Sequence, residues 1–134
     1  METLSARYLL RGKVAVMSDT TGREIIYKFM ASGDPGLPVV NEQMEIVGVV
    51  TEYDILKALK DGMSLDDIVA EKIMSRTPIT ADVNTPAKKL MEMMLESNLT
   101  IIPIIDKSRF LGIVSRYEIL NAYADVNYYK FFGD

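Results

Sequence analysis

Two stretches of this chain repeat one pattern, GVVTEYDILKAL at residues 48–59 and GIVSRYEILNAY at residues 112–123. They lie at an offset of 64 residues, which aligns Gly48 with Gly112 and places identical or chemically similar residues at most of the following positions. A repeat of this size indicates one supersecondary unit that occurs twice, because such a unit cannot bury its apolar face alone.

The repeat continues upstream of these stretches. Thr21 aligns with Thr85 at the same offset, and LPVV at residues 37–40 answers IPII at residues 102–105. The second pair is shifted by one residue, which we assign to the flanking loops because loops absorb insertions easily. The two copies therefore cover most of the chain.

Each copy predicts the element order β-α-β-β-α, because short apolar runs favour strands and a helical spacing of apolar residues favours helices. Thr85 suits an N-cap, Pro86 the first position of a helix, and Gly62 the position just after one. For the first copy the pattern predicts strands at residues 14–16, 37–40 and 46–50 and helices at residues 21–31 and 52–60. For the second copy it predicts strands at residues 79–81, 102–105 and 110–114 and helices at residues 86–97 and 116–124.

The copies divide the chain into residues 1–62 and residues 63–134. A unit of about 50 residues buries too little surface to be stable by itself. We therefore predict an α+β fold in which the two copies pack face to face about a pseudo-twofold axis.

Short helices are expected to lead into both copies. Ser64 is predicted to start one that continues through residue 69, and residues 1–12 are predicted to form the matching helix of the first copy. Leu9 then takes the place that Ile73 has in the linker.

The composition excludes several classes of function. The 134 residues carry a net charge of −4 and include neither cysteine nor histidine. Nucleic-acid binding needs a basic surface, so the acidic balance argues against it, and no apolar run is long enough to span a membrane. Disulfides, the usual zinc sites and histidine-based acid–base catalysis are lost with those two residue types. Carboxylates, lysine, tyrosine, serine and threonine remain, so the composition alone does not exclude enzyme chemistry. On balance we expect a cytoplasmic protein that is not an enzyme and holds no metal or cofactor.

The element order, the hydrophobic-proline-hydrophobic strands and the closing Gly-x-x-[Ser/Thr]-x-x-acid pattern resemble the CBS domain, and two copies resemble the CBS pair or Bateman module. The stretches that carry the resemblance are LPVVNEQMEIVGVVTEYDIL, IPIIDKSRFLGIVSRYEIL and KIMSRTPIT, and together with their flanks they cover nearly the whole chain. The resemblance implies a sensor that binds AMP, ADP, ATP or S-adenosylmethionine in clefts between the repeats. It also implies a homodimer and an unidentified protein partner that the module regulates.

The strand-to-helix junction of the first copy suits a nucleotide. A helix N-terminus favours a phosphate or another anion, and the Thr51 hydroxyl can donate to a phosphate oxygen. Asp54 can accept from both hydroxyls of a ribose, as a carboxylate does in dinucleotide-binding folds. Apolar side chains would enclose the adenine, and the family pattern adds two residues before the LPVV strand. The predicted ligand-binding residues of this copy are Val14, Val16, Met17, Asp34, Pro35, Leu37, Pro38, Val49, Thr51, Tyr53 and Asp54.

The second copy offers a similar but altered set. Its predicted ligand-binding residues are Arg76, Ile79, Thr80, Thr100, Ile102, Pro103, Ile113, Ser115, Arg116 and Glu118. Glu118 departs from the aspartate that is usual in the family, and a capping box prefers Glu or Gln at this position. We expect Glu118 to suit a capping box better than Asp54 does, and the first copy to hold the better adenosyl site.

Alternatives remain open for the other candidates. Thr51 and Asp54 also fit a capping box, which only the repeat context outweighs. Arg76 and Arg116 would meet a phosphate or lie solvated at the surface. Two tyrosines, Tyr53 and Tyr117, would either line the ligand cleft or pack beneath the cleft, and packing is favoured.

Two apolar clusters have more than one interpretation. Three methionines suit an adaptable sensor surface, but packing in the core or in a dimer is favoured; they are Met91, Met93 and Met94. Four aromatic residues near the end suit a partner surface or a cover over the module's own helices; they are Tyr128, Tyr129, Phe131 and Phe132.

Two other functions are weighed against the sensor. One is a structural dimerisation module that binds no small molecule. The other is an enzyme that acts on nucleotides through Asp54 and a metal ion, which is disfavoured because the motif offers neither a second carboxylate nor a P-loop.

Overall fold

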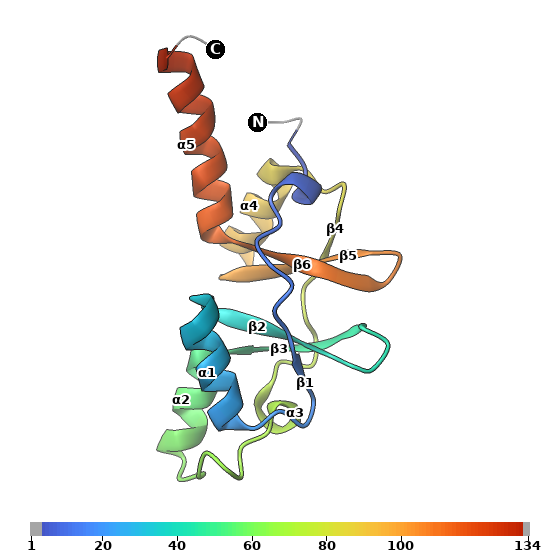
Figure 1. Ribbon diagram of the computed structural model, residues 1–134, viewed down its shortest axis with the longest axis vertical. Helices are drawn as coiled ribbons and strands as arrows, with labels where there is room; N and C mark the ends of the chain where they lie inside the picture. The colour runs from blue at the N-terminus through green and yellow to red at the C-terminus, as the bar shows by residue number, and fades with distance from the viewer. Residues whose placement is uncertain (1–3, 133–134) are drawn as a thin grey trace. The chain divides into compact units, whose positions relative to one another are not determined.

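The computed structural model describes residues 4–132, with side chains described for residues 4–124 (Figure 1). The elements of the first repeat are β1 (Val16–Met17), α1 (Gly22–Ser32), β2 (Gly36–Val40), β3 (Ile46–Thr51) and α2 (Glu52–Lys60). Those of the second are β4 (Ala81–Asp82), α4 (Ala87–Glu96), β5 (Ile101–Asp106), β6 (Arg109–Ser115) and α5 (Arg116–Phe132). Two short helices, η1 (Ala6–Tyr8) and α3 (Ala70–Ile73), precede the repeats. The predicted α+β class with two β-α-β-β-α repeats is confirmed.

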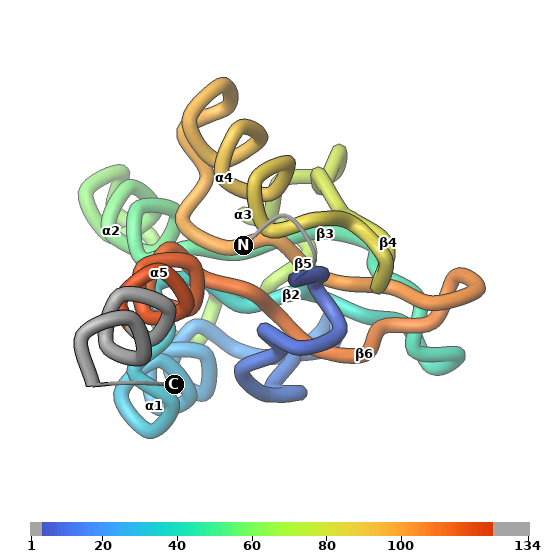
Figure 2. The backbone as a smooth tube through the Cα atoms, turned by 90° about the horizontal axis from the view of Figure 1, so that it is seen from above, coloured from blue at the N-terminus to red at the C-terminus, as the bar shows by residue number. Residues whose placement is uncertain are grey.

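Each repeat builds its own three-stranded sheet, in the orders β1-β2-β3 and β4-β5-β6. The first strand runs parallel to the second, with Val16 beside Val39 in one sheet and Ala81 beside Ile104 in the other. In the first sheet β2 and β3 then form an antiparallel hairpin. The turn of each hairpin points away from the helices of its own repeat (Figures 1 and 2).

The contacts within the chain group it into two units. One, the first-repeat unit, consists of Lys13–Ile79 with Lys107–Phe110. The other, the second-repeat unit, consists of residues 4–12, Thr80–Asp106 and residues 111–132. Each unit therefore contains the segment that leads into the other repeat. These two lead-in segments are residues 4–12, which precede the first repeat, and residues 61–79, which precede the second.

Each unit encloses an apolar core. That of the first-repeat unit includes Val16, Ile25, Phe29, Leu37, Val39, Val50, Ile55, Ala58, Ile68 and Ala70. That of the second-repeat unit includes Ala6, Leu9, Ala81, Val83, Ala87, Leu90, Met94, Ile102, Ile104, Val114, Ile119 and Ala122. Ile68 belongs to the first-repeat core and Leu9 to the second-repeat core, so each lead-in segment packs into the core of the repeat that it does not precede.

The N-terminal lead-in segment is held on the second repeat by backbone hydrogen bonds. Ala6 N–H donates to the carbonyl of Thr85 over 2.8 Å, and Arg7 N–H donates to the carbonyl of Val83 over 2.9 Å. The prediction that this segment forms the matching helix of the first copy is wrong for the described residues 4–12. They contain a single 3-10 turn, and their partners lie in the second repeat.

The linker is held on the first repeat in the same way. Gly22 N–H donates to the carbonyl of Ile68 over 2.8 Å, and Ala70 N–H donates to the carbonyl of Thr20 over 2.9 Å. The predicted linker helix starting at Ser64 is wrong in its position. Ser64 instead closes one turn through its hydrogen bonds with Asp67, and the helix follows later as α3.

Two aligned glycines allow the lead-in segments to approach the hairpins closely. A Cβ on Gly48 would meet the Met74 sulfur and, at 2.7 Å, the carbonyl oxygen of Ser75. A Cβ on Gly112 would meet the carbonyl oxygen of Gly12 at 2.9 Å. The repeated glycine that defines the sequence pattern is thus explained by close backbone contact.

The helix ends match their sequence signals with small shifts. The Thr21 side chain caps α1, and Gly62 follows α2 with φ of 94°, as a residue past a helix end does. Pro86 is the N-cap of α4 rather than its first helical residue, so the predicted cap at Thr85 is displaced by one position. Both first strands are two residues long and begin two positions later than predicted.

Candidate ligand-binding site

The first junction lies where β3 passes into α2. The fold brings together here the predicted residues of β3 and α2 and those in and just before β2. Thr51 ends β3 opposite Gly36, the first residue of β2, and Pro38 pairs with Val49 in the same hairpin. The residues just before β2, Asp34 and Pro35, therefore approach this junction along the chain. Asp34 is buried, and its backbone N–H donates to the Ser32 hydroxyl over 3.2 Å.

Thr51 and Asp54 form a reciprocal capping box. Asp54 Oδ2 accepts the Thr51 backbone N–H at 2.8 Å and the Thr51 hydroxyl at 3.0 Å. In return, the Thr51 oxygen accepts the Asp54 N–H at 3.4 Å. The helix cap considered from the sequence is therefore present. It uses the one donor hydrogen of the Thr51 hydroxyl, which was predicted from the sequence to donate to a phosphate oxygen.

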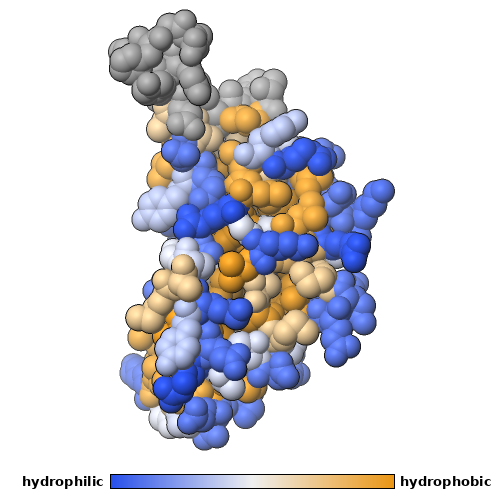
Figure 3. Space-filling view, in the orientation of Figure 1, coloured by the Kyte–Doolittle hydropathy of each residue, from blue (hydrophilic) through white to orange (hydrophobic). Residues whose placement is uncertain are grey.

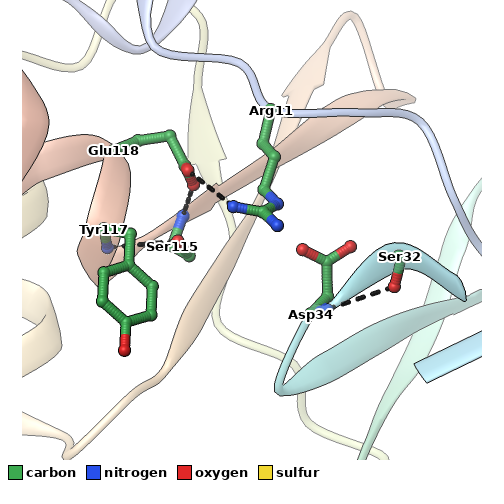
Figure 4. A network of polar contacts seen from close by, with 6 residues as sticks. All are labelled: Arg11, Ser32, Asp34, Ser115, Tyr117 and Glu118. Atoms are coloured by element: carbon green, nitrogen blue, oxygen red, sulfur yellow. Dashed lines mark hydrogen bonds and ion pairs between the residues drawn. The ribbon is translucent and has the colours of Figure 1, made fainter. Parts of the chain in front are cut away.

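The second junction, where β6 passes into α5, has a different set of bonds (Figure 4). Glu118 Oε1 accepts the Ser115 backbone N–H at 2.6 Å, but the Ser115 hydroxyl accepts from Tyr117 N–H, at 3.1 Å. The expectation that Glu118 suits the capping box better than Asp54 is wrong, because only one half of the reciprocal pair forms here.

Glu118 also pairs with a cation from the N-terminal segment. Arg11 Nη1 lies 3.2 Å from Glu118 Oε2, and Figure 4 shows the two side chains pointing toward one another. Both carboxylate oxygens of Glu118 are thus occupied. In the described part of the chain, by contrast, no hydrogen bond ends on Oδ1 of Asp54.

Most of the apolar side chains that were predicted to enclose the adenine are buried in the two cores. Val16 and Leu37 are enclosed in the first-repeat unit, and Ile102 and Ile113 are enclosed in the second-repeat unit, each 2% exposed or less. These side chains support the sheets, and they present little surface to a ligand in this structure. The predicted residues that keep some exposure are Val14, Met17, Pro35, Val49, Ile79, Thr80 and Thr100, whereas Pro38 and Pro103 are buried.

The two candidate phosphate-binding arginines already donate to backbone carbonyls. Arg76 Nη2 lies 2.8 Å from the carbonyl oxygen of Glu71, the second residue of α3. Arg116 Nε lies 2.8 Å from the carbonyl oxygen of Leu99, in the turn that precedes β5. Both side chains therefore stabilise local turns. Arg76 and Ile79, predicted with the second copy, belong to the first-repeat unit.

The predicted packing of the tyrosines is wrong. Tyr53 and Tyr117 are 68% and 69% exposed, because each is the second residue of its helix and points outward. The predicted packing of the methionines is confirmed for the core: Met94 is buried in the second-repeat core, and Met91 and Met93 pack against it. The four aromatic residues at positions 128–132 lie outside the residues whose side chains are described.

Arg11 is not among the site residues predicted from the sequence. No motif marks it, since its partner Glu118 is 107 positions away, and only the path of the N-terminal segment brings them together. Within the described residues, no group of three His, Cys, Asp or Glu side chains is arranged to hold a metal ion. Over the same residues, no helix is long and apolar enough to cross a membrane.

Comparison with known proteins decides the family. The sequence model of the CBS domain matches residues 8–61 and again residues 69–125, which together span most of the chain and both junctions. The chain belongs to the CBS domain family. The two matched ranges agree with the two repeats, so this chain is a CBS domain pair.

A relative with no assigned function comes from Methanopyrus kandleri. It is 31% identical over 123 residues, which make up 90% of this chain and 63% of the relative. The CBS pair described here thus spans somewhat less than two thirds of that protein.

Two solved structures are similar to this chain in both fold and sequence. An uncharacterized conserved protein from Pyrococcus horikoshii is 28% identical, with a TM-score of 0.80 and coverage of 92% of this chain and 94% of that one. The CBS domain pair of protein MJ0100 was solved in complex with 5′-methylthioadenosine and S-adenosyl-L-methionine. It is 27% identical, with a TM-score of 0.78 and coverage of 90% of this chain and 99% of that one.

Proposed function

We propose that this CBS pair is a regulatory module that binds an adenosine-containing small molecule at the junction of Thr51 and Asp54. The candidate ligands are AMP, ADP, ATP and S-adenosylmethionine. The observation that carries the proposal is the state of Asp54, whose Oδ2 closes the helix cap while Oδ1 accepts no hydrogen bond in the described part of the chain. A carboxylate oxygen in this state can accept from a ribose hydroxyl without dissolving the cap.

The surroundings of Asp54 suit the rest of such a ligand. The N-terminus of α2 carries partial positive charge that favours a phosphate. The half-exposed Val14 and Val49 offer apolar contact for a purine. The related pair of protein MJ0100, which was solved with two adenosyl compounds, supports this ligand class. CBS pairs generally act as regulatory modules, so we expect the ligand to control a separate protein partner.

Thermal unfolding in the presence of adenosyl compounds tests the proposal. A ligand that binds the native state raises its stability by RT ln(1 + [L]/Kd), which is about 2.7 kcal/mol at a hundredfold excess over Kd. AMP, ADP, ATP, S-adenosylmethionine and 5′-methylthioadenosine should be compared at one concentration. We expect at least one to raise the Tm, and a chain that responds to none of them contradicts the proposal.

Asp54→Asn separates the ribose contact from the cap. The amide keeps an oxygen that can accept the Thr51 N–H, but it loses the second acceptor that the ribose needs. The matched control is Asp61→Asn, which removes the same charge at the end of the same helix, where Asp61 pairs with Lys57 over 3.9 Å. We expect Asp54→Asn to abolish the ligand-induced shift and Asp61→Asn to retain it.

A structural dimerisation module is the second candidate. Large apolar side chains are exposed on the helices of the first-repeat unit, among them Tyr27 and Met30 on α1 and Leu56 on α2. Apolar atoms reach the surface in the region where Figure 1 draws these helices (Figure 3). We expect a homodimer under either function, to be measured by sedimentation equilibrium. Dimerisation without any ligand-induced shift would favour this second function.

A further inference from the structure

The backbone of Arg11 is fastened beside the second junction. Its N–H donates to the carbonyl of Ile113 over 2.9 Å, and Ile113 N–H donates to the carbonyl of Gly12 over 3.1 Å. Ile113 lies in β6, two residues before Ser115. These two bonds, together with the close contact at Gly112, fix the starting point of the Arg11 side chain next to the junction.

From this fixed backbone, Arg11 reaches the carboxylate of Glu118. The 3.2 Å pair is partly shielded, with side chains 34% and 17% exposed for Arg11 and Glu118. The other oxygen of Glu118 accepts the Ser115 N–H at 2.6 Å. Each oxygen of Glu118 has room for a second hydrogen bond, but a ribose hydroxyl at this junction would have to share Oε2 with the guanidinium, whose positive charge and bulk lie against it, or Oε1 with the helix cap.

The first repeat has a similar backbone arrangement with a different side chain. Ser75 aligns with Arg11, and Val49 aligns with Ile113. Ser75 exchanges two backbone hydrogen bonds with Val49, of 3.2 and 2.9 Å, so it takes both the donor place of Arg11 and the acceptor place of Gly12. Ser75 carries no charge and is too short to neutralise a carboxylate. Asp54 is also one methylene shorter than Glu118. The two junctions thus differ in whether a lead-in side chain engages the carboxylate.

We propose that Arg11 closes the second junction to adenosyl ligands and so determines that each chain binds one such ligand, at the first junction. This inference rests on the proposed function, because it takes the carboxylate of each junction as the acceptor for the ribose. Arg11 is a specificity-determining residue in this sense. Removing its guanidinium opens a second binding site, whereas a residue with a purely structural role gives no added binding when it is replaced.

Isothermal titration with S-adenosylmethionine, and in parallel with AMP, measures the number of ligands per chain. We expect the wild-type chain to bind one equivalent and Arg11→Met to bind two. The matched control is Arg7→Met, which lies in the same segment, where Arg7 donates to Asn84 over 3.4 Å. We expect this control to stay at one equivalent.

A second variant tests the same inference by changing the carboxylate and leaving the arginine in place. Glu118→Asp shortens the carboxylate and withdraws it from Arg11, so we expect it too to bind a second equivalent. Adding Asp54→Asn to Arg11→Met should leave one equivalent, now at the second junction. This double variant also shows which junction each binding event belongs to.

The outcomes separate this inference from the proposed function. One equivalent in the wild-type chain and in both opening variants overturns the role of Arg11 and leaves the proposed function intact. Two equivalents in the wild-type chain, or one that Asp54→Asn retains and Glu118→Gln removes, also overturn it. If no protein in the series binds either compound, the proposed function fails and the inference fails with it.

Discussion

The two strand-to-helix junctions have nearly the same sequence and different chemistry. At the first, Thr51 and Asp54 complete a reciprocal cap that uses one carboxylate oxygen. At the second, Glu118 holds a half-formed cap with one oxygen and Arg11 with the other. The difference shows that a motif read along the chain describes the local hydrogen bonds of a junction, while a residue from a distant segment can add a further partner to its carboxylate.

A further lesson concerns the lead-in segments, which are exchanged between the repeats. The segment before β1 completes the second-repeat core through Leu9, and the segment before β4 completes the first-repeat core through Ile68. The stability of each repeat therefore depends on residues that precede the other, and at the second junction one partner of the carboxylate comes from such a segment too.

Truncation of the two core residues of the lead-in segments should have the largest effect. Leu9 and Ile68 are 8% and 0% exposed, and truncation of such side chains to alanine costs about 2–5 kcal/mol. We expect Leu9→Ala to speed amide hydrogen exchange mainly in β5 and β6, and Ile68→Ala mainly in β2 and β3. The opposite assignment would show that the lead-in segments serve their own repeats.

The aligned glycines should differ in their tolerance of a side chain. Gly48→Ala places a methyl group 2.7 Å from the backbone oxygen of Ser75, where the chain must shift, and overpacking of this kind costs about 1–3 kcal/mol. Gly112→Ala meets its nearest atom, the Gly12 oxygen, at 2.9 Å and should cost less. Urea unfolding measures the free energy of unfolding of both variants. A larger loss of stability in Gly112→Ala than in Gly48→Ala would contradict this expectation.

Loss of the helix cap at the first junction should lower the stability of the protein moderately. Thr51→Ala removes an N-cap side chain and is expected to lower the free energy of unfolding by about 1 kcal/mol. Thr51→Ser keeps the hydroxyl and should restore most of that stability. We expect Ser115→Ala to cost less than Thr51→Ala, since Ser115 accepts one backbone bond in a half-formed box. Thermal unfolding of the three variants, without ligand, is the measurement.

The smallest effect on stability is expected from Arg11→Met. Pairs that keep this much exposure contribute at most about 1 kcal/mol, and added salt weakens them. The free energy of unfolding should therefore change little, and the small difference should shrink at high salt. A loss of several kcal/mol would assign Arg11 a mainly structural role and would weaken the case that it controls ligand access.

Much of the local structure could be predicted from the sequence. The helix predicted at residues 52–60 coincides with α2, and the strands of both hairpins lie within one residue of their predicted ends. Capping residues and the glycine after α2 act through neighbours a few positions away, so their signals are visible in the chain itself. The exposure of Tyr53 and Tyr117 was not predicted, because the side of a helix that meets a neighbour depends on packing.

The sequence alone indicates that this protein contains one β-α-β-β-α unit twice. It also indicates that the last strand of each unit passes into the last helix at a junction with a hydroxyl and a carboxylate three residues apart. These features follow from periodicity and from hydrogen bonds between near neighbours. Which lead-in segment completes which core, and the pairing of Arg11 with Glu118, depend on the tertiary fold. Contacts across a separation of 107 positions depend on the path of the whole chain, and local propensity carries no information about that path.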